Sequence, residues 1–554
     1  MKNFGDCCKE IEGYVKKCLW ANLVWLYNSV LDLILYLIHV LMFKINPFWI
    51  ELFYFLSSSS LGFLVLKVSK PKSITTFRPQ NLDLFFTAVS AVTVSSMSTL
   101  EMEVFSNAQL IVLTILMFTG GEVFVSSLQL QMKKAKISQK GLLRHYSSTE
   151  SYSSSSNPNI DQSISDHIEL GLPTCTDQFE QETSCTCKYK PEYLQAESME
   201  ENQVWKLRCI KILSYVVSSY LVVIHAVGIT SIAVYLKLTP SAKQVLNQKG
   251  LNISTFSFFT IVSTFSNCGF LPNNENMIIF KKNSGLSLLL IPYMLLGNTL
   301  YAACLRFLVF LLQKATRKEE FKFMLKNYGE LGYEHLMTGV DSVYLAISVL
   351  GFLVMQMIVF CCLQWNSEVV GGLSFYEKIV GSFFQVVNSR HTGLSVFDLS
   401  AVSPGMLLLF LIMMYLPPYA RFVPVEEAPK NGGGNLRRKR FDGFWERIML
   451  SPLIYLAIFV FSICVTEREK IKRDPLNFNV FNIVFEVISA YGNVGFSTGY
   501  SCEKQINPDS NCQNATYGFV GRWSDGGKLI LIVVMFFGRL KKLNKQGGRA
   551  WKFS

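Results

Sequence analysis

One short pattern occurs four times along the chain, and it restricts the folds that the sequence can adopt. In each copy a phenylalanine precedes a small residue by ten positions inside an apolar stretch. The pairs are Phe86 with Ser96, Phe259 with Gly269, Phe383 with Gly393, and Phe485 with Gly495. Three copies also carry a serine six residues before the small residue, at Ser90, Ser263 and Ser489, where the third copy has Val387. Recurrence at a fixed spacing predicts a repeated architecture.

Each copy is typical of a short apolar helix that stops abruptly. In the fourth copy, residues 481–498, the helical pattern ends at Gly492 and Gly495. Two glycines so close together break a helix and turn its backbone carbonyls elsewhere. Such an element suits a membrane, where backbone oxygens can line a water-filled path. We therefore predict four re-entrant pore segments, at 81–99, 251–270, 375–395 and 477–496.

The composition places these segments in a membrane protein. Half of the 554 residues are hydrophobic and only 17% are charged, whereas soluble proteins carry about 25% charged residues. The net charge of +12 could indicate nucleic-acid binding, but the basic residues cluster just after apolar runs, which is the pattern of cytoplasmic loops. The clusters are Lys133, Lys134 and Lys136; Lys314, Arg317 and Lys318; Arg437 to Arg440; and Lys541, Lys542 and Lys545. We expect no nucleic-acid partner.

Apolar segments long enough to cross a bilayer, about 20 residues each, flank every pore segment. The sequence thus predicts an all-α membrane protein with four M-P-M repeats (helix, pore segment, helix) and eight transmembrane helices around a central pore. The predicted repeats occupy 46–130, 207–313, 340–423 and 447–540. A secondary transporter with inverted repeats is the less favoured alternative, because these repeats are parallel in pattern.

The remaining segments are predicted to be cytoplasmic, with both termini on that side. Residues 1–45 form the N-terminus, in which 18–43 reads as an amphipathic surface helix or an extra membrane helix. Residues 131–206 are acidic and contain a serine run, 147–156, so we predict a disordered linker whose serines are a plain spacer or phosphorylation sites. Residues 541–554 form the C-terminus.

Two N-glycosylation acceptors support this topology. Asn252 and Asn514 both fall in loops that the prediction places outside the membrane. Cys502 and Cys512 lie in the same outer loop as Asn514 and could form a disulfide there.

Four half-helices that enter from outside would point their C-termini at a shared axis. Helix C-termini carry partial negative charge and favour a cation. Acids near the expected outer mouth would concentrate cations, or they are ordinary solvated loop charges: Glu101, Glu103, Glu275, Asp398 and Glu503. Glu103 and Asp398 are the main candidates among them. The sequence has no phosphate-binding loop and no His-Glu-x-x-His motif, so we expect neither an enzyme nor a cofactor.

Three motifs resemble those of the plant HKT (high-affinity potassium transporter) family, within the Trk/Ktr/HKT superfamily of cation transporters. They are TVSSMSTLEMEVFSNAQL from Thr93, NSRHTG from Asn388 and GNVGFSTGY from Gly492. The resemblance covers the chain except for 1–45 and 139–203.

The resemblance implies a selectivity filter at Ser96, Gly269, Gly393 and Gly495, with Ser95, Asn267 and Asn493 as its neighbours. Backbone carbonyls of the filter would hold the transported Na⁺. Serine at the first position marks the sodium-selective class I, which implies Na⁺ uniport in a plant plasma membrane and sodium retrieval from the xylem. The alternative within the same fold is a Na⁺/K⁺ symporter or a K⁺-permeable transporter. Relatives form dimers, so a homodimer surrounded by membrane lipid is expected.

Two arginines complete the predicted site. Arg390 lies three residues before Gly393 and is expected behind the filter, with Asp398 as its partner. For Arg539 the resemblance implies a position facing acids of the pore wall, and the alternative is snorkelling at the inner membrane surface. Pro417 and Pro418 either break the last helix of the third repeat, as in the gate of bacterial relatives, or simply end it.

Overall fold

The computed structural model describes residues 47–72, 79–153, 192–416, 452–506, 512, 514–515 and 517–544. Within those ranges the regular secondary structure is helical, apart from one isolated bridge between Tyr500 and Ala515. The all-α prediction is therefore confirmed. Predictions for 18–43, for Arg437 to Arg440 and for Pro417 and Pro418 fall outside the described residues.

The first two repeats contain the two longest helices, α5 and α6, and two sharp bends. The helices of the first repeat are α2 (Pro47–Val68), α3 (Asn81–Val92), α4 (Asn107–Gly120) and α5 (Glu122–Ser153). Those of the second are α6 (Glu192–Leu238), α7 (Pro240–Gln248), α8 (Ile253–Ser266), α9 (Ser284–Leu296) and α10 (Tyr301–Thr316). The chain bends by 57° between α4 and α5 and by 81° between α9 and α10.

The last two repeats follow a short connection made of α11 (Glu319–Lys326) and α12 (Tyr328–Leu331). The third repeat contains α13 (Gly339–Gln364), α14 (Phe375–Asn388) and α15 (Pro404–Tyr415). The fourth contains α17 (Pro452–Thr466), α18 (Arg468–Arg473), α19 (Val480–Gly492) and α20 (Asp525–Asn544). The four predicted pore segments thus begin with the short helices α3, α8, α14 and α19.

Local sequence explains where three of these pore helices start. The Asn252 side chain accepts a hydrogen bond from Ser254 N at the start of α8, and Asn479 accepts one from Asn482 N at the start of α19. Ser374 and Glu377 form a reciprocal capping box at the start of α14. Each cap satisfies amide groups that have no partner within the helix. The helices then bury a large aromatic side chain: Phe86, Phe259, Phe384 and Phe485.

Three helices are long and apolar enough to cross a membrane, and the number rises to five if each bent pair is one span. They are Phe48–Val68 in α2, Val204–Leu238 in α6 and Gly339–Gln364 in α13. Exposed apolar side chains such as Val223, Ile347 and Leu350 cover α6 and α13, as expected of a surface that faces lipid. The helices α15 and α17 flank the undescribed residues 417–451 and are shorter, so the count of eight spans stays a prediction.

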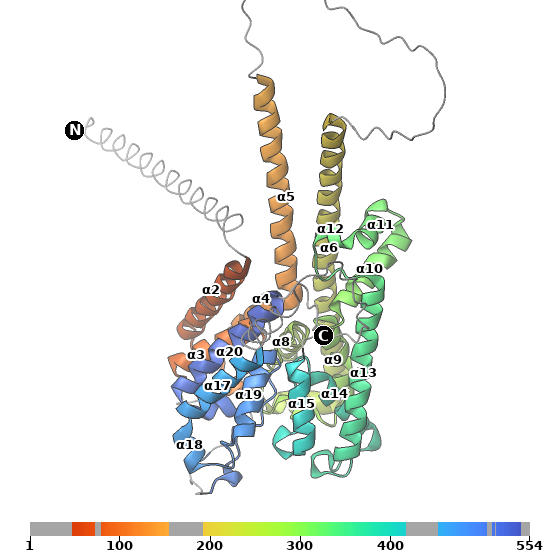
Figure 1. Ribbon diagram of the computed structural model, residues 1–554. Coiled ribbons are helices and arrows are strands. Elements are labelled where there is room, and N and C mark those ends of the chain that lie inside the picture. The colour runs from red at the N-terminus through yellow and green to blue at the C-terminus, as the bar shows by residue number, and fades with distance from the viewer. Residues whose placement is uncertain are drawn as a thin grey trace, which may run out of the picture.

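Two helices extend into the ends of the predicted disordered linker. The helix α5 continues through residue 153, and α6 begins at residue 192. Figure 1 shows the two helices running side by side away from the packed body of the protein. Each is the polar extension of an apolar helix, so propagation adds a hydrogen bond per residue without a new nucleation step. Residues 131–153 and 192–206 are thus helical, 154–191 lie outside the described residues, and the disordered linker stays a prediction.

Candidate functional site

The four predicted filter positions lie next to one another in a closed ring. A Cβ atom added to Gly269 would collide with the Thr392 carbonyl oxygen and lie 2.9 Å from Ser96 Oγ. One added to Gly393 would lie 2.8 Å from the carbonyl carbon of Gly495. One added to Gly495 would lie 2.7 Å from Ser96 Oγ. Each repeat therefore contacts the next around a common axis, and the fourth contacts the first.

All four filter residues have a left-handed backbone. The φ angles are 54° at Ser96, 84° at Gly269, 65° at Gly393 and 98° at Gly495. Glycine adopts this region without the Cβ clash that costs other residues about 1–2 kcal/mol. Glycine at three positions thus satisfies two demands, the backbone angle and the close approach of the neighbouring repeat. Ser96 meets the angle with a side chain in place.

Three pore helices end in the same turn just before the filter. Val94, Asn267 and Asn493 are left-handed, with φ of 51°, 60° and 50°. The next amide in each copy donates to the carbonyl of the repeated serine: Ser95 N to Ser90 O at 2.9 Å, Cys268 N to Ser263 O at 2.9 Å, and Val494 N to Ser489 O at 3.1 Å. This is a Schellman turn, in which asparagine is well tolerated at the left-handed position. It ends the helix two residues before each filter position.

The third repeat reaches the filter by a different turn. Its helix ends at Asn388, and Gly393 N donates to the Asn388 carbonyl at 3.3 Å, one residue out of step with the other copies. The Asn388 side chain accepts hydrogen bonds from Thr392 Oγ1 and, at 3.1 Å, from Leu394 N. The fully buried aromatic is accordingly Phe384, not Phe383 of the sequence pattern.

Hydrogen bonds behind the filter join the first and fourth repeats. Asn493 Nδ2 donates to Ser95 Oγ at 2.8 Å and to the Met535 carbonyl of α20 at 3.3 Å. Ser489 Oγ accepts a hydrogen bond from Gly495 N at 3.0 Å. In the second repeat, Asn267 Nδ2 donates to the Phe265 carbonyl at 3.2 Å. The predicted neighbours Ser95, Asn267 and Asn493 therefore fix the ends of the pore helices.

Three glycines in the second helices pack on the pore helices and were missed from the sequence. A Cβ atom at Gly120, Gly297 or Gly538 would collide with a carbonyl oxygen. The three oxygens belong to Val92, Phe265 and Tyr491, each four residues before its filter position. Gly120 and Gly297 also mark the two bends of 57° and 81°. The recurring register is the sequence signal that could have identified them.

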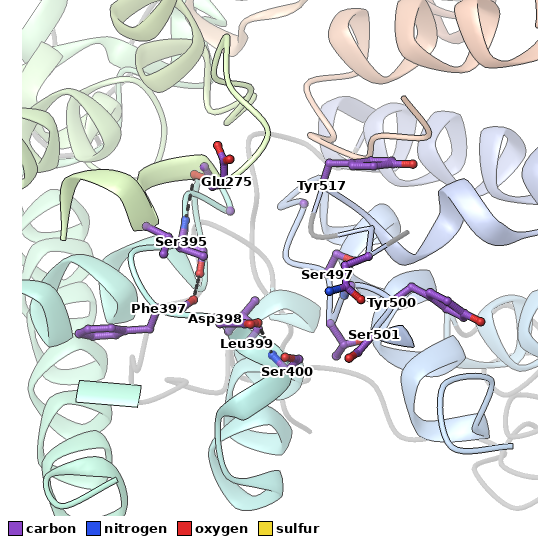
Figure 2. Close-up of a pocket in the computed structure, with 17 residues that line it drawn as sticks. Glu275, Ser395, Phe397, Asp398, Leu399, Ser400, Ser497, Tyr500, Ser501 and Tyr517 are labelled. Atoms are coloured by element: carbon purple, nitrogen blue, oxygen red, sulfur yellow. Dashed lines mark hydrogen bonds between the residues drawn. The ribbon is translucent and has the colours of Figure 1, made fainter. Parts of the chain in front are cut away.

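A polar cavity of about 120 Å³ lies directly beside two filter glycines, Gly393 and Gly495. Figure 2 shows Asp398 and Ser400 on one side of it and Ser497 and Tyr500 on the other. Asp398 Oδ1 accepts a hydrogen bond from Ser400 N at 2.9 Å. The structure thus places Asp398 in the lining of the cavity that Gly393 and Gly495 also line, and its effect on cations stays a prediction.

Glu103 lies in an ion-paired cluster that reaches this cavity through Glu275, one of its lining residues. Lys249 Nζ lies 2.9 Å from Glu103 Oε1 and 2.6 Å from Glu275 Oε1. Partial burial lowers the pKa of Lys249, but its hydrogen bonds to Glu275 and Glu103 outweigh this effect, so the pKa is raised. The single ammonium group therefore stays charged and offsets only one of the two carboxylates, which leaves the cluster with a net negative charge. The role of Glu103 in attracting cations stays a prediction.

Both arginines are buried against aromatic rings. Arg390 is 8% exposed, and its guanidinium lies 4.9 Å from the centre of the Phe352 ring on α13. Among the ion pairs of the described chain, none joins Arg390 to Asp398, so that predicted pairing is wrong. Arg539 is 1% exposed and donates to the Gly120 carbonyl at the bend between α4 and α5. Snorkelling of Arg539 is therefore wrong as well, because the side chain points into the protein.

The predicted modification residues lie in exposed loops. Asn252 is exposed at the start of α8, and Asn514 is exposed and accepts a hydrogen bond from Cys502 N at 2.8 Å. Cys502 and Cys512 form a disulfide, with Cα atoms 5.9 Å apart. Within the described ranges, no group of His, Cys, Asp or Glu side chains could hold a resident metal ion.

Four helix ends that form one ring beside an acid-bearing polar cavity define a single-chain cation pore. The family described as a cation transport protein, TrkH, matches residues 190–420 and 427–545. The chain belongs to this family.

Curated relatives cover most of the chain. "Sodium transporter HKT1" of Arabidopsis thaliana is 48% identical over 496 residues, which are 88% of this chain and 91% of the relative. "Cation transporter HKT1;3" of Oryza sativa subsp. japonica is 46% identical over 507 residues, 92% of this chain and 91% of the relative. The crystal structure of the potassium transporter TrkH from Vibrio parahaemolyticus aligns with a TM-score of 0.47 and 15% identity, over 90% of this chain and 83% of that one.

Proposed function

We propose that the protein is a sodium-selective passive transporter that lets Na⁺ cross the plasma membrane down its electrochemical gradient. The observation that carries this proposal is the closed ring of four filter positions, in which Ser96 alone bears a side chain. The names of the relatives, a sodium transporter and a cation transporter, support the same ion class.

Selection follows from the space that Ser96 takes. Its hydroxymethyl group lies between Gly269 and Gly495, so one quarter of the ring is narrower than a glycine would leave it. K⁺ is the larger ion and loses more contact with backbone oxygens when the ring is distorted. The energy required is small, because a hundredfold preference corresponds to about 2.8 kcal/mol. One side chain is therefore enough to account for the choice of ion.

The setting of the pore follows from the same proposal. The chain crosses the plasma membrane several times, keeps both termini in the cytoplasm and works as a homodimer in lipid, and in a plant it retrieves sodium from the xylem. Exposed apolar residues on α6 and α13 support contact with lipid. Coupled Na⁺/K⁺ transport or K⁺ permeation by the same fold is the alternative.

The test is the reversal potential of currents in oocytes that express the protein. It should shift by about 59 mV for each tenfold change in external Na⁺ and stay constant when external K⁺ changes. A reversal potential that follows K⁺ alone would replace the proposal with K⁺ permeation. A dependence on both ions at once would indicate symport.

A further inference from the structure

Gln385 of the third pore helix is buried beside the chain that follows the filter. The residue is fully buried in α14, eight residues before Gly393. Its Oε1 atom accepts hydrogen bonds from Val396 N at 3.1 Å, Phe397 N at 3.3 Å and Ser395 Oγ at 3.3 Å. Two of the donors are backbone amides, so only the oxygen of the side-chain amide can face them. The orientation of Gln385 is therefore determined by the segment it holds.

The same segment is held from the opposite side by the second repeat. Asn276 Oδ1 accepts hydrogen bonds from Ser395 N at 3.2 Å and from Met277 N at 2.8 Å. Met277 N also donates to the Ser395 carbonyl at 3.1 Å. Figure 2 shows the hydrogen bond that Ser395 Oγ donates to the Phe397 carbonyl, beside the cavity that Ser395 and Phe397 line together with Gly393. Residues 395–397 are thus clamped between Gln385 and Asn276.

The fourth repeat contains a similar brace built from a different residue. Glu486 of α19 is fully buried and accepts a hydrogen bond from Ser497 Oγ, two residues beyond Gly495. Ser497 Oγ in turn accepts from Gly499 N at 3.1 Å and Phe519 N at 2.9 Å. A carboxylate oxygen in the fourth repeat and an amide oxygen in the third therefore play the same part. Each accepts hydrogen bonds from the segment that follows the filter position of its own repeat. In the second repeat, by contrast, the buried Thr260 Oγ1 of α8 has no hydrogen-bond partner.

We propose that Gln385 is a positioning residue for ion selection. Its side-chain oxygen fixes residues 395–397 and thereby the position of Gly393, which the third repeat contributes to the filter. Gln385 does not touch the ion. It acts through the backbone, because Gly393 and Leu394 lie between the pore helix and the clamped segment. The proposal rests on the proposed sodium selectivity and names a determinant of it outside the ring.

The experiment measures the Na⁺/K⁺ permeability ratio in oocytes under bi-ionic conditions, with surface protein quantified by biotinylation. Gln385→Leu keeps the size of the side chain but removes the acceptor, and should lower the ratio about tenfold, a change of about 1.4 kcal/mol. Gln385→Glu keeps an acceptor oxygen, as Glu486 provides in the fourth repeat, and should stay within about twofold of the parent protein. Thr260→Val is the matched control in another pore helix and should change nothing, because its hydroxyl makes no hydrogen bond.

A ratio that stays unchanged in delivered Gln385→Leu protein would overturn the proposal, and so would equal shifts in the Leu and Glu variants. If Gln385→Leu does not reach the surface, Asn276→Ala removes the other half of the clamp, with Asn276→Asp as its conservative partner. The Ala variant should then lower the ratio and the Asp variant should not, and an unchanged ratio again contradicts the clamp. A parent protein without sodium selectivity would refute the proposed function, whereas a selective parent with indifferent variants would refute only the role of Gln385.

Discussion

Ser96 Oγ of the first repeat lies so close to Gly495 of the fourth that a Cβ atom there would be 2.7 Å away. On its other side the same oxygen would be 2.9 Å from a Cβ atom at Gly269. The serine hydroxyl therefore fills the seam between its own repeat and both neighbours. A change at any of these residues alters the space available to an ion, which makes the ring directly testable.

Ser96→Gly should admit K⁺. The substitution removes the only side chain in the ring and suits the left-handed backbone at φ 54°, so delivery to the membrane should be normal. Relative K⁺ permeability should rise at least about tenfold, or about 1.4 kcal/mol, as measured by bi-ionic reversal potentials. Ser90→Ala is the control, since its buried hydroxyl has no hydrogen-bond partner. An unchanged preference in Ser96→Gly would place the determinant elsewhere.

Alanine or a larger residue at Gly269, Gly393 or Gly495 should reduce conduction without blocking delivery. Each glycine has positive φ and faces the backbone or Ser96 of the next repeat. The sodium current per surface molecule should fall at least about tenfold, because the side chain enters the ring and strains the backbone. Gly351→Ala in α13, where a Cβ atom meets nothing within 4 Å, should leave the current intact. A normal current would remove the substituted glycine from the conduction path.

Gly538→Ala should destabilise the packing of α20 on α19. The added methyl would collide with the Tyr491 carbonyl oxygen, and overpacking of this kind costs typically about 1–3 kcal/mol. The unfolding temperature of the purified protein in detergent should fall. Gly526→Ala in the same helix is the control, because its methyl would lie at an ordinary 3.5 Å from Thr466. Equal unfolding temperatures for the two variants would show that the close contact is unimportant.

Lys249→Gln should increase sodium current at low ionic strength. The substitution removes the ammonium that pairs with Glu103 and Glu275 and leaves two carboxylates without it, one of which, Glu275, lines the cavity beside the filter. The gain should disappear at about 1 M salt, where charges are screened within about 3 Å. Identical currents at low salt would show that this cluster has no electrostatic influence on the pore.

The same lysine should cause no pH dependence in the physiological range. Its pKa in the folded protein is raised, so its contribution to stability is fully present below the ordinary value of 10.5. That contribution is lost only as the pH rises through the still higher pKa of the folded state. The unfolding temperatures of the parent protein and of Lys249→Gln should therefore differ by the same amount at pH 6 and pH 8. A difference that changes between these pH values would contradict the assigned charge state.

The four repeats could be predicted from spacing because a pore helix and the small residue after it are adjacent in sequence, and the family resemblance then assigned the filter to those small residues. It could not be predicted that Phe384, and not Phe383, is the fully buried aromatic of the third pore helix, because two consecutive phenylalanines give no sign of which one is buried. The roles of Gly120, Gly297 and Gly538 depend on which helix packs against them. A glycine in an apolar stretch does not reveal this.

Some sequence patterns fit two arrangements equally. A lone arginine near the end of an apolar helix can snorkel to the membrane surface or turn into the protein. Arg539 turns inward, because it donates a hydrogen bond to the Gly120 carbonyl at the bend after α4. The sharp bends lie in the first and second repeats, where glycines meet pore-helix carbonyls. α15 ends at Tyr415, and both readings of Pro417 and Pro418 stay predictions, because these residues lie outside the described part of the chain.

A ring assembled from four unlike stretches of one polypeptide can be altered one quadrant at a time. A channel of identical subunits has no such freedom, because each exchange of an amino acid is copied fourfold. Here a single amino-acid exchange can narrow the opening by one hydroxymethyl group, while the other three quadrants keep their shape. The third quadrant, for example, keeps its separate turn at Asn388. Ion preference in such a molecule can evolve in small graded steps.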